Sequence, residues 1–433
     1  MLFYHQPTDL LKKIASTYRP LIILMVLFPL STEAMEKDEL PMTQEQVLEK
    51  QISQVEIAYI ESHISDILEE DGTQFTPHEE QRDQFLIDEQ LVLDYKTKQS
   101  YSDTELEPAF GLALDGGGMR GLLTSRWLLY FRDLLKDAGY NIPLSRVFKC
   151  VGGTSIGGIL SLFIGTDLFR LEQLEQLNIN NPDPYDTLTN FFLKHGEMIF
   201  PPEIWNKVRL RHLWGFIGCR YSSEPLRELL QQELGSMTLE DVSTNVIVTA
   251  CTTSGQPKVF KSFAEEDKGY ELWKVGLCTS AAPTYFRAFP LEGQNYVDGG
   301  LWMNNPSPLV ATSMVKELHG GVFSPPNLYM LSLGTGEFLY PPIPENARLS
   351  ISTAKCVINL LTQSNSQGNH ETMKSFLGNN YYRVNCSLGA PIDLAAADKM
   401  SIDKLEEYAN QEPQRQIIQS FAEEYIMVNR TRM

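Results

Sequence analysis

The chain has 433 residues, of which 42% are apolar, and a formal net charge of -19 at pH 7. This length allows one large catalytic domain with an appended segment, and the apolar content is sufficient for a sizeable core. The negative charge argues against nucleic acid as a partner, because no basic stripe is available to neutralise phosphates, and it does not favour simple adhesion to anionic membranes.

Residues 1–34 are typical of a targeting segment. Lys12, Lys13 and Arg19 precede the apolar run LIILMVLFPL, which has the length of a signal-peptide core and is too short to span a bilayer. The stretch from Thr32 to Ala34 fits a cleavage site. We therefore expect export or secretion; the alternative is an uncleaved, membrane-associated segment.

Residues 35–107 are strongly acidic, with roughly twenty Asp and Glu against about five Lys and Arg. Apolar residues at helical spacing between Gln44 and Glu70 predict a helix. We expect an acidic, largely helical extension that caps the domain or binds a protein activator or partner. A partly disordered leader is the alternative.

From residue 108 to about 340, short apolar strands alternate with helices. The expected strands are 110–114, 147–151, 245–251, 259–263, a strand that ends at Asp298, and 328–334, and a helix is expected from Pro306 to Leu318. This alternation predicts an α/β fold of three layers, with helices on both faces of a central, largely parallel sheet. Residues 341–433 are expected to pack on this catalytic domain, with Asp393 and Asp398 as surface or helix-cap residues.

The first strand ends in the sequence DGGGMRG. Consecutive amides at Gly116, Gly117 and Gly118 predict an anion cradle at the start of a helix, as an oxyanion site requires. Arg120, one turn further on, is expected to steady this loop or to meet a lipid phosphate.

The second strand leads into GTSIG, which matches the G-x-S-x-G nucleophile elbow. The turn places Ser155 in strained backbone geometry, and only residues without a Cβ, here Gly153 and Gly157, allow strand and helix to pass so closely. The sequence therefore predicts Ser155 as a nucleophile.

A later strand ends at Asp298, followed by Gly299 and Gly300. A carboxylate at the end of a different strand is where a base for Ser155 would be found in an open α/β sheet.

The ordered set DGGGMRG, GTSIGG, SAAPTYF (Ser280 to Phe286) and DGG followed by NNP (Asn304 to Pro306) resembles the patatin-like phospholipase family. The likeness covers about 110 to 340 and weakens toward 410. It implies the same three-layer fold and a lipid acyl hydrolase, such as a phospholipase A, with a Ser155/Asp298 dyad. It also implies no metal or organic cofactor, and an acyl-lipid substrate at a membrane surface.

Three alternatives to this interpretation stay open. A Ser/Asp/His triad would use His319 or His370, both of which follow Asp298 but lie in polar contexts typical of solvated histidines. Gly116, Gly118 and Gly121 also spell the dinucleotide fingerprint G-x-G-x-x-G, although the second strand lacks the acidic residue that holds a ribose. The third alternative is a non-catalytic lipid-binding protein of the same fold.

Two further features have a structural and a functional interpretation. The segment from Phe191 to Cys219 interleaves aromatic and basic residues, which indicates a lipid-facing lid or, more commonly, core aromatics. The six cysteines show no metal-site spacing, and Cys150 and Cys251 are expected in buried strands. A disulfide is left open if the protein is exported.

Overall fold

The described part of the chain is built around a mixed sheet of eight strands. The structure is a computed structural model that describes residues 108–167, 185–202, 219–318, 327–338 and 351–430. The predicted leader (1–34), the acidic extension (35–107), His319 and most of the second half of the 191–219 segment lie outside these residues.

The core of the sheet is parallel, in the order β8-β7-β1-β2-β3, and three antiparallel strands complete it. β4 pairs antiparallel with β3, as does β6, and β5 pairs with β6. The strand bounds are β1 Ala109–Leu114, β2 Cys150–Thr154, β3 Asn245–Thr252, β4 Pro257–Lys261, β5 Phe289–Leu291, β6 Gln294–Asp298, β7 Leu328–Leu333 and β8 Tyr381–Val384.

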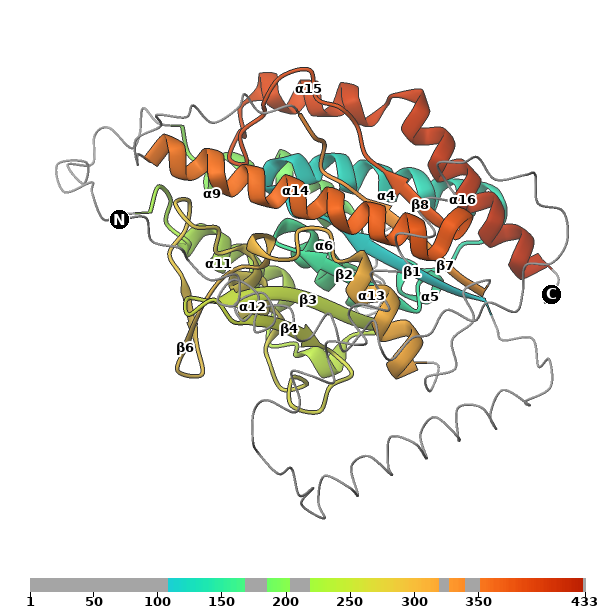
Figure 1. The fold of residues 1–433 in the computed structure, drawn as a ribbon, viewed down its shortest axis with the longest axis horizontal. Coiled ribbons are helices and arrows are strands. Elements are labelled where there is room, and N and C mark those ends of the chain that lie inside the picture. The colour runs from blue at the N-terminus through green and yellow to red at the C-terminus, as the bar shows by residue number, and fades with distance from the viewer. Residues whose placement is uncertain (1–107, 168–184, 203–218, 319–326, 339–350, 431–433) are drawn as a thin grey trace, which may run out of the picture. The chain divides into compact units, whose positions relative to one another are not determined.

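Helices cover both faces of this sheet, so the predicted three-layer fold is confirmed (Figure 1). One face carries α4 (Gly121–Asp137), α6 (Ile156–Gly165), α12 (Leu272–Ser280) and α16 (Glu412–Arg430); the other carries α13 (Ser307–Ser313) and α14 (Ile351–Leu377). The remaining helices are α5 (Leu144–Val147), α8 (Asp186–Leu193), α9 (Gly196–Ile199), α11 (Glu224–Leu234) and α15 (Lys399–Ala409).

Alternation along β1 explains why the two faces pack differently. Phe110, Leu112 and Leu114 contribute to the large core beneath α4 and α6, whereas Ala109 and Ala113 belong to the smaller core under α13 and α14. The small side chains on the second face allow α13 to approach the strands closely. A Cβ at Gly152 in β2 would lie 2.3 Å from a methyl group of Val310 in α13.

Three strands pair with the two edges of β3, and their arrangement positions the candidate site. β2 pairs with β3 up to Thr154, which is opposite Thr249, and β4 occupies the other edge. Asp298, the last residue of β6, is opposite Ala250, the next residue of β3. Because β4 also pairs with Ala250, β6 must lie on the edge that β2 has just left. The ends of β2 and β6 therefore meet on one edge of β3.

Two predicted elements differ from the structure in detail. The strand expected over 147–151 begins only at Cys150, because Val147 still belongs to α5, whose last turn is closed by the Phe148 amide donating to the Leu144 carbonyl. The helix expected from Pro306 onward changes after Ser313 to a π-helical turn over Met314–Leu318.

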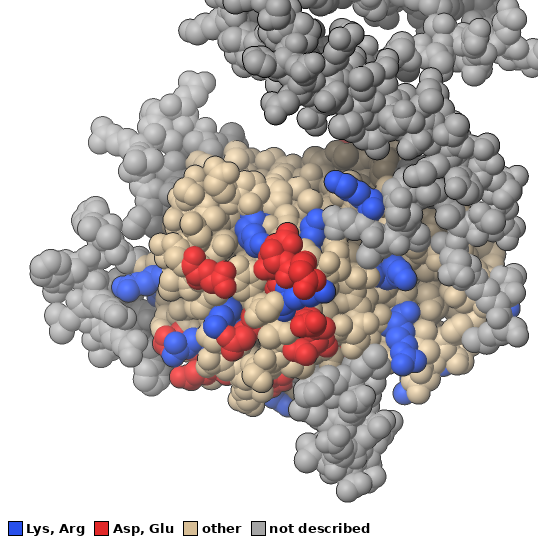
Figure 2. Space-filling model, turned by 90° about the horizontal axis from the view of Figure 1, so that it is seen from below, with Lys and Arg blue, Asp and Glu red and all other residues tan. Residues whose placement is uncertain are grey.

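Charged side chains are mixed on the surface that the structure describes. Figure 2 shows Lys and Arg side chains interspersed with Asp and Glu on the face that it draws. Several form local ion pairs, such as Lys268 with Glu265 and Lys274 with Glu271. In the described ranges, no helix is both long enough and apolar enough to span a bilayer. All six cysteines are free, and Cys150 and Cys251 are buried in β2 and β3 as expected.

The C-terminal part joins the sheet through a buried ion pair. β8 adds a parallel strand next to β7, and its Arg383 contacts Asp115, at the end of β1, with N–O distances of 2.8 and 2.6 Å. The side chains are only 10% and 3% exposed. Ser366 of α14 donates to the same carboxylate. Residues 351–430 are thus part of the fold that carries the first glycine loop.

We predict that Arg383→Leu lowers the free energy of unfolding by about 3–5 kcal/mol, because Asp115 would be left buried without its counter-ion. The matched control is Arg126→Leu, which breaks the Arg126–Glu406 pair between α4 and α15. Those side chains are 35% and 28% exposed, so the expected loss is below about 1 kcal/mol. Denaturant unfolding of both variants measures the difference; equal losses would contradict the prediction.

Candidate active site

Ser155 lies at the tight junction between β2 and α6. Its backbone has φ 54° and ψ -124°, a conformation that residues with a Cβ rarely adopt. The Ser155 amide donates to Thr279 Oγ1 at 2.8 Å, and that hydroxyl donates to the Thr249 carbonyl at 2.6 Å. The surrounding structure therefore holds Ser155 in a strained position.

The glycines on either side of Ser155 are required by close backbone contacts. A Cβ at Gly153 would lie 2.0 Å from the Gly157 carbonyl oxygen, and a Cβ at Gly157 would lie 2.2 Å from the Leu114 carbonyl oxygen. At Gly299, a Cβ would lie 2.5 Å from the Thr249 carbonyl oxygen. These contacts are with backbone atoms, which cannot move aside as a flexible side chain can.

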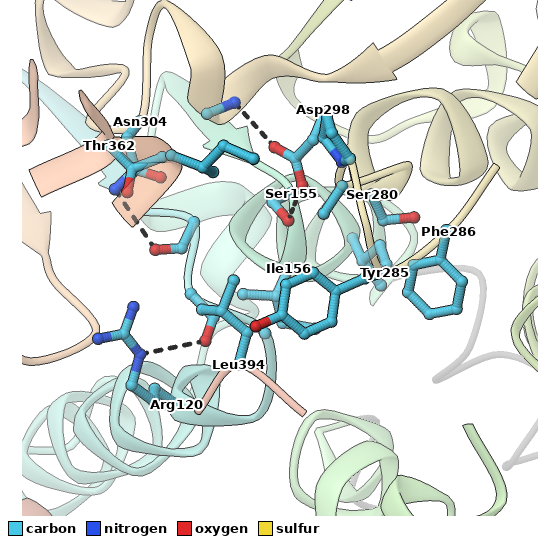
Figure 3. A pocket seen from close by; sticks show the side chains of 18 of the residues that line it. Arg120, Ser155, Ile156, Ser280, Tyr285, Phe286, Asp298, Asn304, Thr362 and Leu394 are labelled. Carbon is cyan, nitrogen blue, oxygen red and sulfur yellow. Dashed lines mark hydrogen bonds between the residues drawn. The ribbon is translucent and has the colours of Figure 1, made fainter. Parts of the chain in front are cut away.

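Asp298 directly faces Ser155. The Ser155 hydroxyl donates to Asp298 Oδ2 at 2.5 Å, and the Gly300 amide donates to Oδ1 at 2.8 Å (Figure 3). Asp298 is 6% exposed. Burial raises the pKa of this carboxyl to about 6, while the two hydrogen bonds oppose the shift. The structure thus brings the two residues predicted from separate motifs into direct contact.

The first glycine loop, Gly116 to Gly118, lies beside Ser155 and Asp298. Two of its carbonyl groups are held by hydrogen bonds from other groups of the protein. The Gly116 carbonyl accepts from Thr335 Oγ1 at 2.8 Å, and the Gly117 carbonyl accepts from the Arg120 amide at 3.2 Å. In a planar trans peptide the next N–H points opposite to the carbonyl. The amides of Gly117 and Gly118 therefore point away from these anchors, and we find no protein acceptor for either in the described residues.

Gly116 and Arg120 have different positions from these two amides. The Gly116 amide donates to the Asn304 carbonyl at 3.2 Å, so it is already engaged and we do not include it among the donors available to a substrate. The Arg120 side chain donates to the Gly117 and Gly336 carbonyls at 3.4 and 3.5 Å and stacks over Phe338. Arg120 therefore braces the loop and also borders the pocket.

A pocket surrounds Ser155 and Asp298. Apart from the glycine loop, Arg120 and a few other polar groups, its walls are apolar. They come from α6, α8, α9, α11, α14 and two loops, with the side chains of Ile156, Ile159, Phe191, Ile199, Phe200, Leu226, Pro283, Tyr285, Phe286, Leu301, Ile358 and Leu394. An apolar lining of this kind suits a hydrocarbon chain next to a few oriented polar groups.

One wall of the pocket is fixed by Asp393, which we expected to be a surface or cap residue. Asp398 does cap α15, accepting from the Ser401 amide at 3.1 Å. Asp393 is a surface residue as expected, with a side chain 46% exposed, and it also accepts from the hydroxyl of Tyr285 at 3.1 and 3.2 Å. Its neighbour Leu394 lines the pocket, and the Leu394 carbonyl accepts from the Met119 amide at 2.8 Å. This loop therefore supports both the pocket and the glycine loop.

The histidines proposed for a triad lie away from the pocket or outside the residues that the structure describes. Much of the segment proposed as a lid is also outside these residues. His370 is on α14, where its ring packs against Tyr381 and burial lowers its pKa; it does not line the pocket. Phe191 and Phe192 are buried in the core, and Phe191 and Phe200 also line the pocket. The lid hypothesis for the rest of that segment falls on residues 203–218, which are not described.

Sequence reasoning missed Asn304, Thr335 and Leu394 as parts of the site. Asn304 was within the quoted NNP motif, but nothing in the motif indicates that its carbonyl engages Gly116. Thr335 follows β7, and the rule that carboxyl ends of parallel strands meet at one edge would have indicated it. Leu394 carries no sequence signal, because its position depends on a loop far along the chain.

We predict that Gly157→Ala destabilises the protein by about 1–3 kcal/mol or prevents folding, because its Cβ would meet the Leu114 backbone. The control is Gly368→Ala in α14, where a Cβ meets nothing within 4 Å. That change should stabilise by about 0.5–1 kcal/mol, through the better helix propensity of alanine. Thermal and denaturant unfolding measure both; an unaffected Gly157→Ala variant would contradict the prediction.

Comparison with known proteins agrees with this geometry. Residues 112–310 match the family model described as patatin-like phospholipase. Patatin-like protein 2 from Oryza sativa subsp. indica is 31% identical over 223 residues, which cover 48% of this chain and 52% of the relative. Patatin-like protein 2 from Arabidopsis thaliana is 30% identical over 254 residues, which cover 52% of this chain and 59% of the relative. A cGAMP-activated phospholipase from Escherichia coli (strain TW11681) is 31% identical over 236 residues, which cover 52% of this chain and 61% of the relative. The match thus spans little more than half the length of these relatives, and over residues 112–310 the chain is similar to the patatin-like phospholipase family.

Proposed function

We propose that this protein hydrolyses fatty acyl esters of lipids, with phospholipids as the leading substrate class. The observation that carries the proposal is the 2.5 Å hydrogen bond from the Ser155 hydroxyl to the buried carboxylate of Asp298, inside a largely apolar pocket. A hydroxyl, a base and free amide donors next to space for a hydrocarbon chain are the components of acyl transfer.

The reaction proceeds in two steps through an acyl-enzyme. Ser155 Oγ attacks the ester carbonyl carbon while its proton passes to Asp298 Oδ2. The negative charge that forms on the carbonyl oxygen is held by the amides of Gly117 and Gly118. The intermediate collapses, and the leaving alcohol takes the proton from Asp298. Water then attacks the acyl-Ser155 ester while Asp298 again accepts the proton. The ester bond to Ser155 breaks, Asp298 returns the proton to Ser155 Oγ, and fatty acid is released.

A carboxylate acts as the base without a histidine because its environment increases its basicity. A solvated Asp has a pKa of about 4 and is a weak base at neutral pH. Burial raises the pKa of Asp298 to about 6, nearer to the working pH, while the short hydrogen bond keeps it aligned with Ser155. The remaining barrier is lowered by the two oriented amides rather than by proton transfer.

The relatives support lipid as the substrate. One is named a cGAMP-activated phospholipase, and the family description names phospholipases. The pocket walls provide apolar surface on several sides of Ser155, as an acyl chain requires.

Ser155→Ala and Asp298→Asn are each expected to reduce fatty acid release from phospholipid at least about a thousandfold while the protein stays folded. Ser155→Ala removes the nucleophile, and Asp298→Asn removes the base. Product analysis with purified protein, together with circular dichroism, measures both outcomes. The control is His370→Ala, which is expected to retain activity because His370 does not line the pocket.

Three results would contradict this assignment. Normal hydrolysis by either dyad variant would remove the Ser/Asp mechanism, and loss of turnover in a folded His370→Ala variant would favour a triad. An inactive wild-type protein that still binds lipid would favour a binding protein of the same fold.

The pH dependence tests the base independently. Below about pH 6 Asp298 is protonated and cannot accept the Ser155 proton; above it, the carboxylate is available. We therefore expect kcat/KM for a soluble ester to rise about tenfold per pH unit below pH 6 and to level off above it. A profile that is flat from about pH 5 to 8 would exclude Asp298 as the essential base.

A further inference from the structure

Exposed apolar side chains gather beside the pocket. The described residues include eight exposed large hydrophobic side chains, and five of them are next in sequence or within one helical turn of a pocket-lining residue. Three of the five, Val357, Leu360 and Leu361, lie on α14. Leu193 is the last residue of α8, and Met198 lies in α9. The exposed fractions of the five side chains are 38–48%. We refer to the three on α14 as the α14 rim.

The α14 rim is continuous with the pocket wall. Val357, Leu360 and Leu361 have i, i+3 and i+4 spacing, so they form one patch on the helix. Ile358 and Thr362 of the same turns line the pocket. On α8 and α9, Met198 directly precedes the lining residue Ile199, and Leu193 follows the lining residue Phe191 by two positions. Figure 1 shows α9 and the start of α14 at the same end of the described fold, beyond the carboxyl ends of β1 and β2.

The charge pattern indicates what this surface contacts. From Cys356 to Asn369, α14 carries no charged side chain, in a chain with a formal net charge of -19. Attraction to an anionic lipid surface needs clustered Lys and Arg, which this stretch lacks. Aliphatic side chains without charge instead gain free energy by leaving water for the acyl boundary of a bilayer.

We infer that the α14 rim docks the protein onto an electrically neutral lipid surface, by inserting Val357, Leu360 and Leu361 beside the mouth of the acyl pocket. This inference rests on the proposed function, because docking is useful to an enzyme whose acyl-chain substrate must pass from the lipid layer into the pocket. Docking through the helix that also forms the wall shortens that path and keeps it out of water. Binding should therefore need no anionic lipid and should persist at high salt.

The test uses the full chain with Ser155→Ala, so that vesicles stay intact, and phosphatidylcholine vesicles in a sedimentation assay. Leu361→Asp is expected to weaken binding about tenfold, and Leu360→Asp with Leu361→Asp about a hundredfold. The matched control is Met427→Asp on α16. Met427 is 58% exposed and lies between Tyr425 and Asn429, which border the amino-terminal end of β1, away from the site. This control should bind as the parent does.

A second arm separates docking from catalysis. In the otherwise wild-type chain, the rim variants should hydrolyse a water-soluble short-chain ester at the normal rate but lose activity on phosphatidylcholine vesicles. An inactive wild-type protein that still binds vesicles through the rim would overturn the proposed function and leave the docking inference standing.

Several outcomes would overturn the docking inference. Equal binding by the rim variants and their parent would exclude the rim, and an equal loss in Met427→Asp would show that the loss is not specific to it. Binding only to vesicles with anionic lipid, or lost at high salt, would point to electrostatic attachment. If wild-type protein ignores vesicles and the rim variants convert a dimer to a monomer in sedimentation velocity, the patch is covered by a second copy instead.

Discussion

The hydrogen bond between Ser155 and Asp298 depends on how β3 shares one of its edges. β2 leaves that edge at Thr154, and β6 takes it over at the next residue of β3. Two strands that are remote in sequence thereby end against each other, and the Ser155 hydroxyl after one faces the Asp298 carboxylate of the other. The close approach excludes water, and the same exclusion raises the pKa of Asp298. Geometry and basicity therefore have one cause.

The glycine loop is immobilised from several directions, which suits a site that must hold charge without rearranging. Asp115 is fixed by Arg383 and Ser366, and the Gly116 carbonyl by Thr335. These anchors hold a side chain and a carbonyl, so they leave the amides of Gly117 and Gly118 oriented and, among the described residues, without an acceptor. Fixed dipoles of this kind stabilise a developing oxyanion without reorganisation at the moment of reaction. The buried Asp115–Arg383 pair thus contributes more to the position of the loop than its net stabilisation would indicate.

The sequence predicted the elements and the chemistry well, because both are local in the chain. Gly153 and Gly157 mark a strained turn, and the DGG after a strand marks a carboxylate at a sheet edge. What the sequence could not give depends on contacts between distant segments: that the Gly116 amide is taken by Asn304, and that Asp393 holds Tyr285. An exposed acidic residue in a loop has no local pattern that separates a pocket support from a surface charge.

The pocket includes residues inside and outside the segment that matches the family model. The segment that matches the family, 112–310, contains Ser155, Asp298 and the glycine loop, whereas Ile358, Thr362 and Leu394 of the pocket wall lie beyond it. Chemistry tolerates little change, because each catalytic atom must meet another within hydrogen-bonding distance. A pocket wall needs only apolar surface of suitable shape, so it can differ between relatives that catalyse the same reaction. Family likeness therefore supports the proposed reaction, whereas part of the pocket wall, on α14 and on the loop that carries Leu394, lies outside the segment that the family model matches.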